Sequence, residues 1–343
     1  MSETPFVAIN TSLENILNCQ YLYWYNLYSK YTITPAKILT IPHSFVEYLE
    51  ADDIALPHAP SHESTLFQSP TPNSDNEYSD WEEEPVSSKP DPTLHFADFH
   101  KEIQHVISDY KSVAPKLNWS APQDALWITT GNTMKCRSTT DLYLLLKSSD
   151  YINHDLYHAF DDLDEKPKNV DFHLVLRKWS DINPALEFRC FVNSKKLIAI
   201  SQKDLNYYSY LPQIQDEVQD KIEDFFEDVL LDTFTSNSYI FDVYVPKPYN
   251  KVYLVDINLW SRSTDSLLFS WHELANGEIG CKEPEFRLVT EHNSGRFSRK
   301  AHGENHVPRE FLEAGGEMGD MVELLKRIQE LETQGNSTDD EEY

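Results

Sequence analysis

Three oxygen-bearing side chains lie within or at the end of two apolar, aromatic-rich stretches. Asp242 lies inside the stretch 239–245, and Asp256 and Asn258 end the stretch 251–258. Residues two apart on a strand point to the same face, and pairing of the two stretches as a hairpin would bring Asp242 beside the other two. Two carboxylates and an amide oxygen suit a hard cation such as Mg²⁺. The alternative is a strand end that carries turn-forming Asp and Asn.

Basic side chains upstream of these acids are candidates for binding phosphate. Lys116 lies in a polar and aromatic loop, and Arg177 comes at the end of the predicted strand 173–179. The alternative for Lys116 is an ordinary exposed lysine beside a proline. Arg189 is two residues from Glu187, so the pair is either a salt bridge on the face of a strand or a guanidinium aimed at phosphate by its carboxylate neighbour. The pattern alone gives these two interpretations equal weight.

The glycine content restricts how a nucleotide can be bound. The chain has nine glycines, and Gly131 is the only one between Met1 and Asn276. A Walker loop or a GxGxxG turn needs several glycines for close approach of the backbone to phosphate, which excludes both from that region. Any nucleotide there must be held by side chains.

Hydrophobic periodicity predicts the elements that position these side chains. An aromatic-rich helix is expected over 9–31, and the alternative for that segment is an exposed peptide-binding surface. Apolar residues at helical spacing predict further helices at 96–107, 138–148 and 214–230, with a short strand and then a helix in 32–50. Alternating or β-branched stretches predict strands at 173–179, 187–192, 196–202, 239–245, 251–258 and 285–289. The expected class is α+β.

Changes in composition along the chain indicate its domain organisation. We expect residues 1–55 to form the N-terminal helical part of the body and 94–295 to form the core. The stretch 56–93 is rich in Pro, Ser and acidic residues and predicts an acidic disordered loop. Residues 296–343 predict a C-terminal extension with a helix over 318–331 and an acidic tail.

Overall charge and cysteine spacing limit the class of protein. The 343-residue chain has a formal net charge of −28, which argues against general nucleic-acid binding. It favours a basic protein partner or a site where local cations oppose the overall negative field. Four widely spaced cysteines form no CxxC pair, so neither a zinc site nor a disulfide framework is predicted. The N-terminus lacks signal-peptide features and no apolar run approaches the length of a membrane span, so we expect a cytoplasmic protein without a membrane partner.

Several segments together closely resemble the cell-division-cycle protein 123 family. The motifs that carry the resemblance are 115–122, 174–179, 187–191, 200–204, 254–258 and 265–269, and the resemblance extends from about residue 15 to residue 295. It implies an ATP-grasp-like fold, in which two α+β subdomains clamp ATP and Mg²⁺. It also implies a chaperone that binds the gamma subunit of eukaryotic translation initiation factor 2, a GTPase, and promotes assembly of the heterotrimer. Such an activity would support translation initiation and cell-cycle progression.

The resemblance also implies roles for individual residues. It predicts phosphate contacts for Lys116 and Arg189, and a hinge against adenine formed by 177–179. The full ATP-binding set that it implies is Lys116, Asn118, Trp119, Ser120, Ala121, Arg177, Lys178, Trp179, Arg189, Asp242, Asp256 and Asn258, of which Asp242, Asp256 and Asn258 hold Mg²⁺.

The chain departs from the expected pattern at two places. It lacks the glycine-rich loop that covers the phosphates in many ATP-grasp proteins, and residues 259–261 read Leu-Trp-Ser where family members commonly have Pro-Phe-Gly. Many ATP-grasp proteins are carboxylate-amine ligases that activate a carboxylate as an acyl phosphate, and such a ligase is the alternative function.

Overall fold

The computed structural model describes residues 9, 11–51, 56–57, 91–129, 131–277, 279–280 and 283–292. Within these ranges the chain forms a three-stranded and a five-stranded β-sheet together with helices, which confirms the α+β class. Most of the expected acidic loop 56–93, the predicted helix 318–331 and the acidic tail lie outside the described residues.

The three-stranded sheet is antiparallel and has the order β1-β3-β2. Its strands are β1 (Ala36–Thr40), β2 (Val113–Lys116) and β3 (His173–Lys178). Side chains alternate along β3, so that Leu174 and Leu176 enter one buried cluster while Val175 enters another. Arg177 therefore shares the face of Val175. The two faces of this small sheet thus belong to different parts of the molecule.

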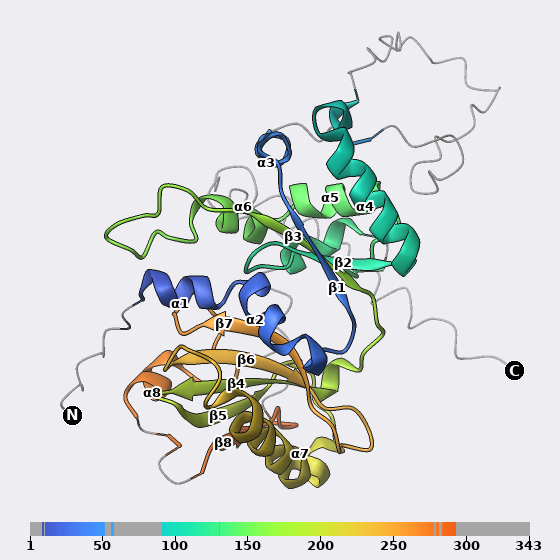
Figure 1. The fold of residues 1–343 in the computed structure, drawn as a ribbon. Coiled ribbons are helices and arrows are strands. Elements are labelled where there is room, and N and C mark those ends of the chain that lie inside the picture. The colour runs from blue at the N-terminus through green and yellow to red at the C-terminus, as the bar shows by residue number, and fades with distance from the viewer. Residues whose placement is uncertain are drawn as a thin grey trace, which may run out of the picture. The chain divides into compact units, whose positions relative to one another are not determined.

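Helices cover the Leu174 face of the small sheet (Figure 1). They are α3 (His43–Glu50), α4 (Ala97–Tyr110) and α5 (Thr139–Lys147), close to the predicted ranges. The apolar period of α4 turns Phe99 and Ile103 inward. Ser138 and Asp141 form a capping box at the start of α5, in which each side chain accepts a backbone amide of the other residue.

The five-stranded sheet has the order β7-β6-β4-β5-β8. Its strands are β4 (Glu187–Asn193), β5 (Lys196–Gln202), β6 (Tyr239–Tyr244), β7 (Tyr253–Leu259) and β8 (Glu285–Arg287). Neighbours pair antiparallel except β5 and β8. The predicted hairpin of β6 with β7 is confirmed, and β4 and β5 form a second hairpin. Ser194 and Lys195 have positive φ angles of 51° and 61°, which gives the β4–β5 turn the conformation whose twist matches the strands.

Helix α7 (Leu211–Phe225), continued by a π-turn at Phe226–Leu230, lies along one face of the large sheet (Figure 1). Phe188 and Phe241 from the sheet share a buried cluster with Val218 and Ile222 of α7. Phe191, on the other face of β4, packs against Phe269 instead. The alternation predicted for 187–192 is therefore confirmed, and it places Arg189 on the face away from α7.

The N-terminal aromatic segment differs from the single predicted helix. It forms α1 (Leu13–Asn18), α2 (Tyr21–Tyr28) and a 3₁₀ turn at Ser29–Tyr31. Gln20 is extended between the two helices, and the Tyr21 amide donates to the Asn118 carbonyl at 2.8 Å. This long-range hydrogen bond replaces a bond within the helix. Tyr21 and Trp24 are buried in the core, so these rings serve packing and not an exposed peptide-binding surface.

Several short elements were not expected from the sequence. They are the 3₁₀ turns η2 (Pro92–Phe96) and η3 (Gln123–Ile128) and the helices α6 (Asp150–Tyr157) and α8 (Trp271–Ala275). Elements of one or two turns are too short to show a helical period in the sequence. None of the helices in the described ranges is long and apolar enough to cross a membrane.

Substitution of Phe45 tests the core between α3, α4 and α5. Phe45 is fully buried, and its ring lies 4.9 to 5.7 Å from the rings of Tyr48, Phe96, Phe99 and Tyr143. We expect Phe45→Ala to lower the free energy of unfolding by about 3–5 kcal/mol, because it leaves a cavity among rigid rings. Urea unfolding measures the change. Leu94→Ala is the control, since Leu94 is 69% exposed and should change stability by less than about 0.5 kcal/mol. Equal effects of the two variants would contradict this view of the core.

Candidate functional site

A row of polar side chains crosses all strands of the five-stranded sheet on the face opposite α7. Asp256 pairs with Asp242, Asp242 with Arg189, Arg189 with Ser201, and Ser201 with Arg287. Residues paired directly across strands point to the same face, so these five side chains, the polar row, lie side by side. The predicted approach of Asp242 to Asp256 is confirmed.

Arg189 and Asp242 form the best-defined interaction of the polar row. The Arg189 Nε and Nη2 atoms donate to the two Asp242 carboxylate oxygens at 2.8 and 2.9 Å, and Nη1 donates to the Asp265 carbonyl at 2.8 Å. Burial alone would raise the pKa of Asp242, but Arg189 and Lys203 reverse this effect and hold its pKa well below its usual range. The carboxylate partner of Arg189 is thus Asp242 and not its sequence neighbour Glu187.

Lys203 is a site residue that the sequence reasoning missed. Its ammonium lies 3.1 Å from an Asp242 oxygen and 3.6 Å from a Glu187 oxygen. A signal was present, since Lys203 lies two residues beyond Ser201 in a stretch of alternating side chains and therefore shares its face. Lys203 is the second cation on Asp242.

Lys116 joins the small sheet to the polar row. Its ammonium lies 2.7 Å from the Asp256 Oδ2 atom and also donates to the Trp119 carbonyl. The Lys116 side chain is only 2% exposed, so the exposed-lysine alternative is wrong. Lys116 pairs with Val175, so both side chains lie on the face of the small sheet that the helices do not cover. Arg177 is two residues after Val175 and therefore lies on the same face. The Arg177 Nε atom is buried without a hydrogen-bond partner among the described residues.

The donor set of Asp242, Asp256 and Asn258 fits Mg²⁺, which prefers hard oxygen ligands. Asn258 has a buried Nδ2 atom with no hydrogen-bond partner in the described part of the chain. Because amide O and N positions are assigned from hydrogen bonding, rotating this amide would place an acceptor oxygen there. Arg189 donates to both Asp242 oxygens, and the Asp256 oxygens accept the Lys116 ammonium and the Ile257 amide, so either carboxylate would exchange a partner on binding a metal. Across the described ranges, no three His, Cys, Asp or Glu side chains form a metal-binding cluster.

The predicted adenine hinge at the end of β3 is split between two faces. Lys178 is exposed, and its place in the strand puts it on the face opposite Arg177. The Trp179 indole donates to the Asp181 carboxylate at 2.8 Å, and the Lys135 ammonium lies over its ring, 5.7 Å from the centroid. The structure therefore brings Arg177 to the Lys116 face but not Lys178.

The loop after Lys116 is held mainly by its own polar side chains. Asn118 donates from Nδ2 to the Asp171 carbonyl at 2.9 Å and accepts the His173 amide at 2.7 Å. The Trp119 indole donates to the Ile16 carbonyl at 2.8 Å. The Asn118 and Trp119 side chains thus fix the loop and are not gathered with the cations.

Ser120 and Ala121 complete this loop through their backbones. The Ser120 amide donates to the Asp155 carboxylate at 2.8 Å, and the Ala121 carbonyl accepts the Gln123 amide at 2.7 Å. Both residues are partly exposed, unlike Asn118. Their predicted contact with ATP stays a prediction.

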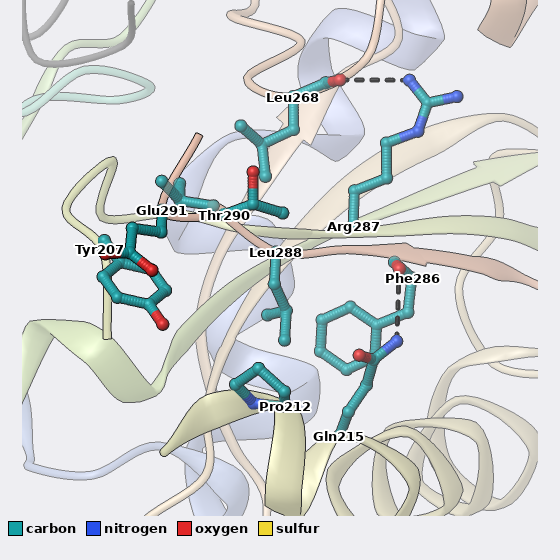
Figure 2. A pocket seen from close by; sticks show the side chains of 10 residues that line it. Tyr207, Pro212, Gln215, Leu268, Phe286, Arg287, Leu288, Thr290 and Glu291 are labelled. Atoms are coloured by element: carbon teal, nitrogen blue, oxygen red, sulfur yellow. Dashed lines mark hydrogen bonds between the residues drawn. The ribbon is translucent and has the colours of Figure 1, made fainter. Parts of the chain in front are cut away.

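A separate pocket of about 520 Å³ lies between the start of α7 and β8 (Figure 2). Its lining is largely apolar, with Leu268, Phe286 and Leu288 turned toward it. Gln215 donates to the Phe286 carbonyl at 3.3 Å and Arg287 donates to the Leu268 carbonyl at 3.1 Å, so these polar groups are already bonded. None of the predicted ATP-binding residues lines this pocket, although Arg287 of the polar row does.

Comparison with known proteins gives consistent matches. The D123 family matches residues 24–315. A relative from Vanderwaltozyma polyspora, named translation initiation factor eIF2 assembly protein, is 44% identical over 96% of this chain and 94% of its own length. A relative from Candida glabrata, named cell division cycle protein 123, is 40% identical over 99% of this chain and 98% of its own length. The solved structure of Cdc123 from Schizosaccharomyces pombe is 36% identical and covers 83% of this chain and 100% of its own, with a TM-score of 0.66.

Acid unfolding tests the buried interaction of Arg189 with Asp242. A carboxyl group whose pKa is lowered by folding stabilises the protein above its unfolded pKa of about 3.9, and this contribution is lost as the pH falls below that value. We expect Arg189→Met to lower the free energy of unfolding at pH 7 by about 3 kcal/mol, because Asp242 stays buried with Lys203 alone. The difference from wild type should narrow below about pH 4.

Urea unfolding between pH 7 and pH 3 measures this difference. Lys221→Met is the matched control, because Lys221 pairs with Asp224 on the exposed side of α7. Removing that exposed pair should lower the free energy of unfolding far less than Arg189→Met does. A gap between Arg189→Met and wild type that did not depend on pH would contradict the assignment to Asp242.

Proposed function

The chain belongs to the D123 family, and on this basis we propose that it is an assembly factor for eukaryotic translation initiation factor 2. The observation that carries the proposal is similarity over nearly the whole chain to a relative named for assembly of that factor. The resemblance noted in the sequence supports a chaperone that binds the gamma subunit and promotes its joining with the other subunits. A second relative, named cell division cycle protein 123, supports a link to cell-cycle progression.

We propose further that the candidate site binds ATP with Mg²⁺ in an ATP-grasp-like arrangement. The support is electrostatic, since Lys116, Arg177, Arg189 and Lys203 gather cationic groups in a chain of net charge −28. Arginine forks and lysine ammonium groups are the side chains that bind phosphate when a glycine-rich loop is absent. Asp256 and Asn258, with Asp242, would hold Mg²⁺, which supplies charge neutralisation of the phosphates when bound.

Lys116 and Asp256 suggest how ligand binding acts on the protein. Lys116 and Asp256 form a direct ion pair between β2 and β7, which links the two sheets. Asp256 cannot give its full charge to both Lys116 and a metal, so in the loaded protein Lys116 is available for phosphate. ATP would then connect the two sheets in place of the direct pair. We propose that this loaded arrangement is the one competent for the partner, in the cytoplasm.

Co-purification tests the assembly function. We expect wild-type protein to retain the gamma subunit in a pulldown, and Asp256→Ala to retain less of it, because the loaded arrangement is lost. Leu94→Ala, an exposed change on η2, should behave as wild type. If the folded wild-type protein failed to bind the gamma subunit with ATP and Mg²⁺ present, the proposed function would be lost.

Calorimetry tests the nucleotide site by itself. We expect Asp256→Ala to weaken binding of ATP with Mg²⁺ by roughly 100-fold or more, since even the loss of outer-shell partners of metal ligands costs about 10- to 100-fold. Asp256→Ala also removes the counter-charge of the buried Lys116 ammonium, so thermal unfolding of the variant must show that it is folded at the temperature of the titration. Asp220→Ala, which removes an exposed carboxylate from α7, is the control. Undiminished ATP affinity of Asp256→Ala would refute the site assignment.

A further inference from the structure

Asp155 of α6 is a buried carboxylate attached to the loop that follows Lys116. It is 1% exposed, and its Oδ2 atom accepts the backbone amides of Trp119 and Ser120 at 3.0 and 2.8 Å. Its Oδ1 atom is buried without a hydrogen-bond partner in the ranges that the structure describes. A buried carboxylate is costly unless it is well bonded, so its place here needs a reason beyond packing.

A single peptide group connects Asp155 to Lys116. The carbonyl of Trp119 accepts the Lys116 ammonium, and the N–H of the same peptide group, that of Ser120, donates to Asp155. In a planar trans peptide the C=O and N–H point in opposite directions. Asp155 and Lys116 therefore hold opposite sides of one rigid plane, and fixing the N–H also fixes the direction of the C=O.

We propose that Asp155 is a positioning residue for the nucleotide site: by binding the Trp119–Ser120 peptide it directs the Trp119 carbonyl at Lys116 and holds the ammonium in place. The inference rests on the proposed ATP function. This positioning matters because Asp256 would be shared between Lys116 and a bound metal. The Trp119 carbonyl is then the partner that Lys116 keeps. Without Asp155 the loop peptide can turn, and Lys116 loses that second anchor.

Asp155 performs this role as a hydrogen-bond acceptor. Burial raises the pKa of Asp155, and the hydrogen bonds from Ser120 and Trp119 and the charge of Lys116 oppose that rise. The geometry requires only an oxygen that accepts two amides, which an asparagine also supplies. The Asn variant should therefore keep the function that the Ala variant loses.

The chain offers a matched control in Asp124. Asp124 accepts the Ser149 hydroxyl and the amide of Asp150, both at 2.6 Å, and so anchors the start of α6 as Asp155 anchors the loop. The groups that donate to Asp124 belong to residues 149–151, and Lys116 is not among these donors. Asp124→Ala removes a carboxylate of η3 that anchors the start of α6, and it should reduce stability without changing the nucleotide site.

Calorimetry with ATP and Mg²⁺ on the full chain gives the first test. We expect Asp155→Ala to weaken ATP binding by about tenfold, and Asp155→Asn and Asp124→Ala to stay within about threefold of wild type. Thermal unfolding of each variant shows whether it is folded at the temperature of the titration. Equal losses in Asp155→Asn and Asp155→Ala, or a loss in Asp124→Ala as large as in Asp155→Ala, would overturn the proposal.

A double-mutant cycle gives a second test that needs no nucleotide. Urea unfolding is measured for Asp155→Ala, Lys116→Met and the two combined. Because both side chains act on one peptide group, we expect the unfolding equilibrium constant of the double variant to differ from the product of the single effects by about fivefold. Multiplicative effects would overturn the link between Asp155 and Lys116. If wild type bound no ATP, the proposed nucleotide function would fail, and this cycle would still decide whether Asp155 positions Lys116.

Discussion

The ion pair between Lys116 and Asp256 is the interaction on which the described arrangement depends. An ammonium that is 2% exposed is stable only if its lost hydration is replaced by a counter-charge and acceptors. Asp256 supplies the first and the Trp119 carbonyl supplies a second. Cys19, at the end of α1, is close enough to the pair for both charges to act on it. Burial is the main cause of its raised pKa, Asp256 raises the pKa further, and Lys116 lowers it. The small sheet, the large sheet and the N-terminal helices therefore meet at one buried charge.

The polar row explains how the large sheet can carry charge on one face and an apolar core on the other. Strict alternation along β4 sends Phe188 and Cys190 toward α7 and Arg189 away from it. On that second face Asp242 is neutralised by Arg189 and Lys203, so its burial does not leave an isolated charge. The same ion pairs hold the Arg189 and Lys203 side chains in fixed positions on this face.

Local patterns predicted most of the elements because their signals come from neighbouring residues. The two hairpins, α4, α5 and α7 have clear periods of two or 3.6 residues, and each is present. The N-terminal helix was predicted as one element and is two, because the amide of Tyr21 bonds to Asn118, about a hundred positions away. Helix α6 was missed because its eight residues are too few to show a helical period, although Ser149 caps its first turn. A hydrogen bond to a distant residue leaves no periodic trace in the sequence.

For the candidate site, the sequence by itself determined which residues share a face. Asp256 and Asn258 are two apart on a strand, and the turn between the strands brings Asp242 to their level, so alternation and hairpin pairing were sufficient. Only the tertiary structure decided which charges meet. It paired Arg189 with Asp242 instead of Glu187, added Lys203, and placed Asp155 behind the Lys116 loop. Ion pairs and buried hydrogen bonds depend on the packing of elements distant in sequence, and no local spacing encodes that packing.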